Sequence, residues 1–155
     1  MSAVVSVLRE DWADPDVPLP SYATAGAAGA DVRANLSPEH REKGLRLAPM
    51  QRLLVPTGMR VEIPLGFEMQ LRPRSGMALK QGLTLLNTPG TIDSDYRGPL
   101  GLLVINLGQA GIVINHGDRL AQAIIAPVIQ ADFVETFSLS DTARGASGFG
   151  STGQG

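Results

Sequence analysis

The sequence has no cysteine and only two histidines, His40 and His116, in 155 residues. Without cysteine there can be no disulfide framework and no thiolate metal site, and two imidazoles make a histidine-based zinc site implausible. Any metal should therefore be a hard cation bound through oxygen ligands. The composition is compatible with a reducing compartment.

Long hydrophobic runs and clusters of like charge are also missing. No apolar run approaches the length of a bilayer, and Met1 to Leu8 lacks the basic start of a secretory signal. Lysine and arginine number 13 against 15 aspartates and glutamates, and the basic residues are scattered. This pattern indicates a soluble, cytoplasmic protein of one domain, with no nucleic-acid and no membrane partner.

Short β-type runs separated by glycine and proline make up most of the chain. Residues 59–63 and 67–72 each alternate apolar and polar side chains, and the Pro-Leu-Gly between them predicts an antiparallel hairpin. Residues 83–86 and 100–106 flank a glycine-bounded loop and predict a second hairpin. Other strands are expected at residues 4–8, 45–47, 121–129 and 133–137.

One short helix is expected at residues 77–81, with Ser75 as its N-cap and Gly82 after its end. Arg74 and Ser75 beside a helix start could bind a phosphate, or they could be an ordinary cap with an exposed arginine. Both interpretations are open on this segment alone.

Two runs, residues 100–106 and 121–129, are almost continuously apolar, which is typical of strands buried on both faces. With few helices to cover a sheet, the second face is expected to pack on another subunit, so the pattern predicts a homo-oligomer. Gln122 interrupts the second run and needs a hydrogen-bond partner, either internal or a ligand. His116 stands next to a glycine in a turn between the two runs and is expected at the surface rather than as a ligand.

The loop Gly90 to Gly98 presents Asp93, Asp95 and Tyr96, and Asp31 begins a strand after a run of small residues. Each feature fits an ordinary turn as well as a binding site. The glycine-rich end, residues 144–155, contains G-x-G-x-x-G, but no helix follows, so it is not a dinucleotide site. It could be a disordered terminus, or an arm able to clamp phosphates and stack on a base.

Five segments, taken together and in order, closely resemble the motifs of the trimeric deoxyuridine triphosphatases (dUTPases). They are Ala28–Val32, Arg74–Met77, Gly90–Gly98, Gly117–Gln122 and Arg144–Gly153. Val32 and Met77 stand where leucine is commoner in the family, a change of packing rather than chemistry. The resemblance implies a jelly-roll-like β-barrel or sandwich (residues 1–143), assembled as a homotrimer, and an arm (residues 144–155) that closes an active site at subunit junctions.

The resemblance also implies the reaction. dUTP and water would give dUMP and pyrophosphate, which keeps uracil out of DNA and supplies dUMP for dTMP synthesis. Asp93 would activate the water that attacks the α-phosphorus, and Asp31 would position the site or a magnesium-bound water. Mg²⁺ would be held by the triphosphate and waters, not directly by protein ligands. Displacement at phosphorus needs alignment and charge neutralisation more than covalent help, which agrees with these roles.

The remaining motif residues are implied to bind substrate. Asn87 would read the uracil edge, and Tyr96 would lie under the deoxyribose and exclude a ribose hydroxyl. The phosphates would be bound by Arg74, Ser75, Gln122, Arg144, Ser151 and Thr152, and Phe149 would stack on the base. Gly76, Thr91, Ile92 and Gly150 are also implied to bind substrate.

Two alternatives share the expected fold. A dCTP deaminase needs a glutamate at the base pocket, and no glutamate occurs between Glu68 and Glu135. A non-catalytic, regulatory nucleotide-binding module would have no need for Asp93 as a base.

Overall fold

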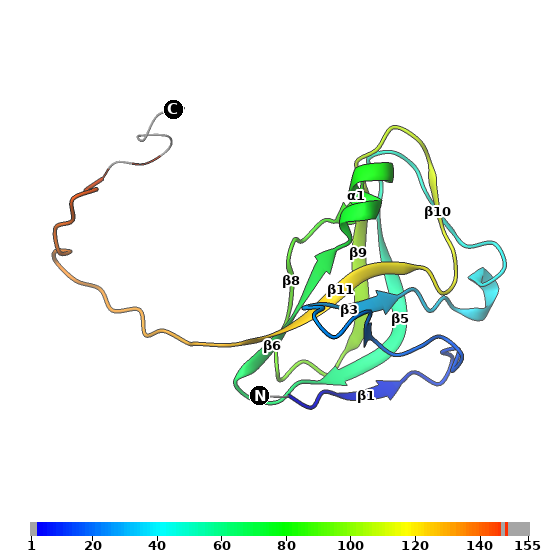
Figure 1. Ribbon diagram of the computed structural model, residues 1–155, viewed down its shortest axis with the longest axis horizontal. Coiled ribbons are helices and arrows are strands. Elements are labelled where there is room, and N and C mark those ends of the chain that lie inside the picture. The colour runs from blue at the N-terminus through cyan, green and yellow to red at the C-terminus, as the bar shows by residue number, and fades with distance from the viewer. Residues whose placement is uncertain (1–2, 147, 149–155) are drawn as a thin grey trace.

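The computed structural model describes residues 3–146 and residue 148. Its elements are mostly short strands, with one 3₁₀ turn and one α-helix among these residues (Figure 1). In chain order they are β1 (Ser6–Arg9), β2 (Ser21–Tyr22), β3 (Ala30–Arg33), η1 (Pro38–His40), β4 (Leu45–Leu47), β5 (Arg52–Glu62), β6 (Phe67–Pro73), α1 (Ser75–Gln81), β7 (Leu83–Leu85), β8 (Gly90–Ile92), β9 (Pro99–Asn106), β10 (Ile112–Ile114) and β11 (Arg119–Pro127). The expected all-β domain with one short helix is confirmed.

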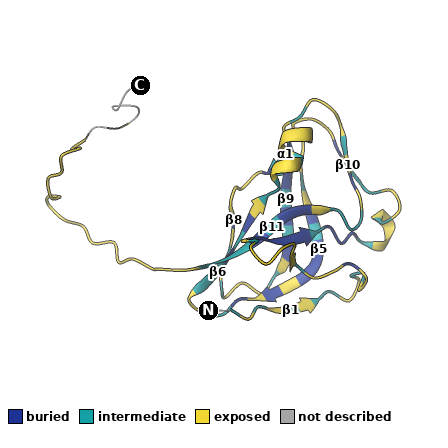
Figure 2. Ribbon diagram, in the orientation of Figure 1, coloured by how far each residue is buried: buried dark blue, intermediate teal, exposed yellow. Residues whose placement is uncertain are grey.

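The strands form two main antiparallel sheets and a small third one. One sheet has the order β1-β5-β9-β7, the other β2-β3-β11-β6-β8, and β10 pairs with β4. Buried side chains of both main sheets join in one core, which the burial colouring shows at the centre of the body (Figure 2). Its fully buried members include Val32, Leu36, Leu47, Val55, Leu100, Leu102, Val104 and Ile114.

Strand β5 is longer than the predicted run of residues 59–63, because it begins at Arg52 and continues through Pro56. Residues 52–56 pair with β9, and residues 59–62 pair with β1. The register shifts between Pro56 and Arg60, and Gly58 there has φ 67°. A proline without an N–H and a glycine with positive φ are the residues expected at such a bend.

The predicted hairpin of residues 59–63 and 67–72 is wrong. β5 pairs with β1 and β9, whereas β6 pairs with β11 and β8 in the other sheet. The turn at Pro64 to Gly66 therefore carries the chain from one sheet to the other. The second predicted hairpin is half right, since β7 and β9 pair antiparallel, but β8 between them crosses to pair with β6.

The predicted strand at residues 133–137 is also wrong. From Val128 to Arg144 no strand is assigned and every residue is exposed. This segment leaves the body as an extended trace (Figures 1 and 2). Phe133 is 99% exposed, so no described residue of this chain buries the apolar side chains that suggested a strand.

The first strand begins and ends slightly later than predicted, at Ser6–Arg9 instead of residues 4–8. Among residues 3–146 and 148, no helix combines the length and hydrophobicity that a membrane crossing requires.

Candidate functional site

Asp31 joins three of the sequence motifs. Its Oδ2 accepts a hydrogen bond from Arg119 Nη1 at 3.0 Å, and its Oδ1 lies 3.5 Å from Arg74 Nε. Arg74 Nη1 also donates to the Arg119 backbone carbonyl at 3.1 Å. Asp31 is only 8% exposed, so the two guanidinium groups compensate a carboxylate that is largely withdrawn from water.

A bulge in β11 determines the direction of Arg119. The register against β3 shifts between Arg119 and Ala121, so that Arg119 lies opposite Arg33 while Gln122 lies opposite Asp31. Leu120 and Ala121 are both buried, which regular alternation would not allow. The extra residue therefore re-aims the arginine toward the carboxylate.

Beside Asp31 is an open depression of about 610 Å³. Cationic side chains predominate over the single carboxylate on its lining, so it suits an anion. Its lining residues are Arg33, Arg74, Gly76, Met77, Lys80, Gln81, Val113, Asn115, Gly117, Asp118 and Arg119.

The helix in this depression was predicted with the wrong cap. α1 begins at Ser75, its N-cap is Arg74, and no side chain caps it. The Arg74 carbonyl already accepts from the N–H groups of Met77 and Ala78, so the helix starts two residues before the predicted Met77. Ser75 and Gly76 are exposed, and Gly82 ends the helix in a left-handed conformation as expected.

Asp93 and Tyr96 belong to a different part of the surface. With Thr91 and Ile92 of β8 they line a depression of about 230 Å³, completed by Leu54, Pro99 and Gly101. Asp93 also borders a second groove with Ser94 and Asp95. The depression that contains Asp93 shares no lining residue with the one that contains Arg74.

The loop after Asp93 is held by its own hydrogen bonds. The Tyr96 N–H donates to the Asp93 carbonyl at 3.2 Å, and the Tyr96 hydroxyl donates to the Pro99 carbonyl at 3.0 Å. Arg97 Nη1 donates to the Ser94 carbonyl at 2.7 Å. A Cβ at Gly98 would lie 2.4 Å from the Tyr96 hydroxyl oxygen, so the ring position depends on glycine there.

Two other predicted residues stand over glycines. The amide nitrogen of Asn87 is 3.2 Å from the position that a Cβ would take on Gly90, which places Asn87 above the start of β8. A Cβ on Gly29 would lie 2.9 Å from Cβ of Gln122. Small residues therefore allow both amide side chains to approach the backbone closely.

Of the C-terminal residues predicted to bind substrate, the structure describes Arg144 alone. Arg144 is exposed on the extended segment, and Phe149, Gly150, Ser151 and Thr152 lie outside the described residues. No group of three or more His, Asp or Glu side chains that could hold a metal ion occurs in the described part of the chain.

His116 is not the surface residue that its glycine turn suggested. Its side chain is 18% exposed, and its ring contacts the Asp14 carboxylate and the Leu36 backbone. Asp14 and its buried partner Asn35 were missed by the sequence analysis, because both stand in ordinary polar loop sequence. A proline-rich loop that returns to the core offers no periodic signal of such contacts.

The geometry agrees with similarity to known proteins. The model of the dUTPase family matches residues 15–153. The deoxyuridine 5'-triphosphate nucleotidohydrolase of Dinoroseobacter shibae is 64% identical over 155 residues, covering 100% of both chains. The dUTPase of Staphylococcus bacteriophage 80alpha with dUPNHPP has a TM-score of 0.82 at 23% identity, covering 97% of this chain and 98% of that one.

A mutant dUTPase from phage phi11 of S. aureus, described with a structural Mg(II) ion, has a TM-score of 0.72 at 22% identity and covers 87% and 97% of the two chains. At these identities the phage structures establish the fold alone. The family match extends from the Asp14 loop to the C-terminal glycines and includes all five motifs. The chain belongs to the dUTPase family.

Proposed function

We propose that this protein hydrolyses dUTP to dUMP and pyrophosphate. The observation that carries the proposal is the meeting of Asp31, Arg74 and Arg119 in a chain of the dUTPase family. These residues come from three motifs that are far apart in the sequence, and Asp31 contacts Arg74 and Arg119, which both line one depression. A triphosphate is the anion that the family relationship supplies.

The phosphates are assigned to this depression. Arg74 would contribute charge, and the exposed Ser75 and Gly76 at the start of α1 would contribute a hydroxyl and a close backbone approach. Gln122 of β11 lies opposite Asp31 of the neighbouring strand β3. From that position its amide would bind a phosphate oxygen.

The uracil and sugar are assigned to the smaller depression. Thr91 and Ile92 provide a strand edge and an apolar wall, and Asn87 offers an amide with both donor and acceptor. Tyr96, fixed by Pro99 and Gly98, would pack under the deoxyribose and leave no room for a 2′-hydroxyl.

Asp93 is assigned as the general base. A carboxylate that accepts a proton from the attacking water contributes about 10² to 10⁴ in rate, and the rest would come from alignment and charge neutralisation. The base must lie within hydrogen-bond reach of the water at the α-phosphorus. Since Asp93 and Arg74 line separate depressions in one chain, the proposal includes a homotrimer in which one chain supplies Asp93 and another the phosphate groups.

Two surface features support this assembly. The half-buried side chain of Leu103 in β9 is available to pack on a neighbouring copy. The segment from Val128 onward carries Phe133 and Phe137, both fully exposed in the single chain. Covering such groups removes apolar area from water at about 25 cal/mol per Å².

The arm, residues 144–155, is proposed to close over a site. Arg144, Ser151 and Thr152 are assigned to the terminal phosphates, Gly150 to a close backbone contact, and Phe149 to stacking on the base. The core contains no described residue after Ile125, so residues 144–155 can be a functional arm attached to a β-domain of residues 1–143.

Mg²⁺ fits this site only as a partner of the substrate. Two carboxylates are available near the proposed phosphate position: Asp118 lines the depression, and Asp31 beside it already faces two arginines. Oδ1 of Asp31 is buried without a hydrogen-bond partner, 3.5 Å from Arg74 Nε, so a water can reach it only after Arg74 moves. The ion would be held by phosphate oxygens and waters, would neutralise their charge, and would be oriented by Asp31 through a water. Cytoplasmic location stays a prediction.

The experiment that tests the function is pyrophosphate release from dUTP, UTP, dTTP and dCTP, each with and without Mg²⁺. We expect Mg²⁺-dependent release from dUTP alone. Release from none of the four would contradict the proposal in favour of a binding module. Ammonia from dCTP would contradict it in favour of a deaminase. Light scattering of the same sample measures the subunit number, and a monomer that is fully active would contradict the shared site.

A further inference from the structure

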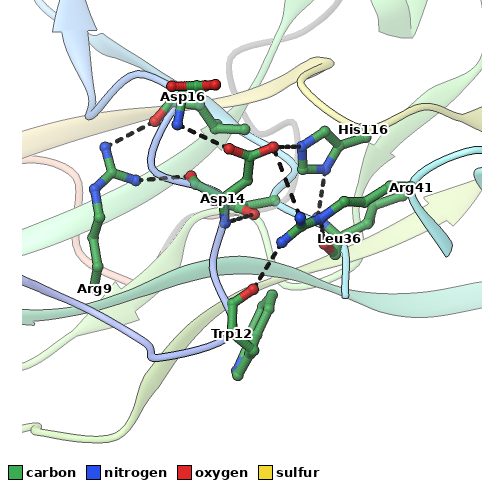
Figure 3. Close-up of polar contacts among 9 residues, drawn as sticks. Arg9, Trp12, Asp14, Asp16, Leu36, Arg41 and His116 are labelled. Carbon is green, nitrogen blue, oxygen red and sulfur yellow. Dashed lines mark hydrogen bonds and ion pairs between the residues drawn. The ribbon is translucent and has the colours of Figure 1, made fainter. Parts of the chain in front are cut away.

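A polar cluster outside both depressions ties the turn before Arg119 to the N-terminal loop. Asp14 lies at the centre of this cluster, and His116 beside it contacts both Asp14 and Leu36 (Figure 3). The Leu36 backbone N–H donates to His116 Nδ1 at 3.0 Å. Because a backbone N–H can only donate, Nδ1 must carry the lone pair. The ring proton is therefore on Nε2, which faces Asp14 Oδ2 at 3.1 Å.

Asp14 is held firmly enough to orient this ring. Asn35, with 0% exposure, accepts from the Asp14 N–H at 3.0 Å and donates to the Asp14 carbonyl at 2.9 Å. The Asp14 carboxylate also accepts from the Asp16 N–H at 2.9 Å and lies 3.9 Å from Arg41. The backbone of Asp14 is thus fixed by a buried amide, and its side chain is aimed at His116.

The ring is connected to the phosphate side through a short turn. The Gly117 N–H donates to the Ala34 carbonyl, and the Ala34 N–H donates to the Asp118 carbonyl, both at 2.9 Å. Arg33 Nη1 donates to the Gly117 carbonyl at 2.8 Å. These bonds hold the turn against the end of β3, and the next residue along the chain is Arg119.

We propose that neutral His116 is a positioning residue for the phosphate-binding side of the active site. Its unprotonated Nδ1 accepts from Leu36 and so fixes the turn of residues 115–118. That turn then holds Arg119 toward Asp31 and Arg74. Protonation of the ring would place an N–H on Nδ1, facing the Leu36 N–H. Two donors cannot bond to each other, so the hydrogen bond from Leu36 to His116 would be lost. Acidification then weakens substrate binding through His116. This inference rests on the proposed function.

The charged groups nearest the ring are Asp14, which it contacts, and Arg41 behind Asp14. A protonated ring keeps its contact with Asp14 while it gives up Leu36, so the change is confined to the bond that holds the turn. The charged groups on the packed elements are Arg9 and Asp16 beside Asp14, Arg33 on β3, Arg41 after η1 and Asp118 in the turn.

The test compares wild type with His116→Asn and with His40→Asn as the matched control. The side-chain oxygen of asparagine is the same number of covalent bonds from the backbone as Nδ1 of histidine. It can therefore accept the hydrogen bond from the Leu36 N–H, but it cannot take up a proton. His40 is exposed at the end of η1, where its backbone N–H donates to the Ser37 carbonyl and its own carbonyl accepts from the Gly44 N–H. KM and kcat for dUTP are measured from about pH 5.5 to about pH 8.5, which spans the ordinary imidazole range.

At the alkaline end we expect the three KM values to agree within roughly twofold. At the acid end KM of wild type and of His40→Asn should exceed that of His116→Asn by roughly three- to tenfold, the loss expected for one hydrogen bond. The kcat ratios should not change with pH. A constant KM ratio between wild type and His116→Asn overturns the inference and leaves the function standing. A wild type that is inactive toward dUTP at every pH overturns the function, and the inference with it.

A second measurement decides the question if His116→Asn does not fold. In ¹⁵N-labelled wild type, imidazole nitrogen shifts report the tautomer of each histidine. We expect His116 at alkaline pH to carry its proton on Nε2, and the Leu36 amide resonance to shift with the titration of that ring. A proton on Nδ1, or a Leu36 amide that does not respond, overturns the inference.

Discussion

Arg119 Nη1 donates to Asp31 Oδ2 over 3.0 Å, which joins residues that are 88 positions apart. The same carboxylate lies 3.5 Å from Arg74 Nε, so one buried acid orients two cations at the edge of the phosphate depression. Without it, two neighbouring guanidinium groups would repel each other at the position where we propose that the triphosphate binds. Asp31 therefore has a structural reason to be an acid, in addition to its proposed contact with a magnesium-bound water.

The first prediction concerns Asp93. Asp93→Asn removes the proposed base but keeps the size and the hydrogen-bonding ability of the side chain. We expect kcat to fall by about two orders of magnitude or more, while dUTP binding stays nearly unchanged. Steady-state kinetics and a binding titration measure the two effects. Asp95→Asn, which changes an exposed carboxylate of the neighbouring groove, is the control and should keep most of its activity. Equal turnover by Asp93→Asn at saturating dUTP would remove Asp93 from this role.

The second prediction concerns the sugar filter. In Gly98→Ala the new Cβ would lie 2.4 Å from the Tyr96 hydroxyl oxygen and 2.6 Å from Cζ, so the ring must move. The tip of a side chain can move at low cost, so we expect the fold to persist while discrimination between dUTP and UTP falls. The ratio of kcat/KM values for the two nucleotides measures this. Gly111→Ala, where a Cβ meets nothing within 4 Å, should leave the ratio unchanged. An unchanged ratio in Gly98→Ala would show that Tyr96 does not filter the sugar.

The third prediction concerns the arm. A chain that stops before Arg144 loses no described residue of the core, so it should fold and assemble as the full chain does. Its activity should collapse, because the proposed contacts to the terminal phosphates and the base are gone. Light scattering and pyrophosphate release measure the two properties. A truncated chain that loses its trimer, or one that keeps its full rate, would contradict the arm assignment.

The fourth prediction concerns acid stability. The pKa of Asp14 is lowered from 3.8, first by the hydrogen bond from the Asp16 backbone N–H and then by the His116 side chain. A lowered pKa in the folded state means that the contribution is present above the ordinary pKa and is lost as the pH falls through the folded value. Asp14→Asn should therefore reduce Tm near neutral pH, and the gap to wild type should narrow at about pH 3. Asp16→Asn leaves the Asp16 N–H in place and serves as the control. A gap that is constant with pH would mean that the Asp14 charge does not stabilise the fold.

Local pattern was sufficient for several strands and for the helix. The strand at Leu45–Leu47 and the strand that begins at Phe67 lie where alternation or an apolar run placed them, and α1 ends at Gly82 as predicted. Alternation reports which residues share a face, but it does not say which strand is the neighbour. The chain between Ile63 and Phe67 could close a hairpin or cross between sheets with the same Pro-Leu-Gly. The crossing between sheets is favoured because it lets both sheets bury their apolar side chains in one core.

The same limit explains the segment after Val128. Its apolar spacing is typical of a strand, yet Phe133 and Phe137 stay fully exposed in the single chain. A strand needs a neighbour to accept its backbone hydrogen bonds, and the sequence does not state where that neighbour is. His116 shows the reverse case, since a glycine turn suggested solvent and the returning N-terminal loop half-buried the ring.

By itself the sequence determined the all-β class, the single short helix and the dUTPase family, because these depend on residue types and on their order along the chain. Only the tertiary structure decided that Asp31, Arg74 and Arg119 meet, that Asp93 and Tyr96 line a separate depression, and that His116 is held by Asp14 and Leu36. Such contacts join residues tens of positions apart, and their energies become favourable only when strand pairing and the shared core bring them together. A local sequence pattern does not show which distant residues the fold brings into contact.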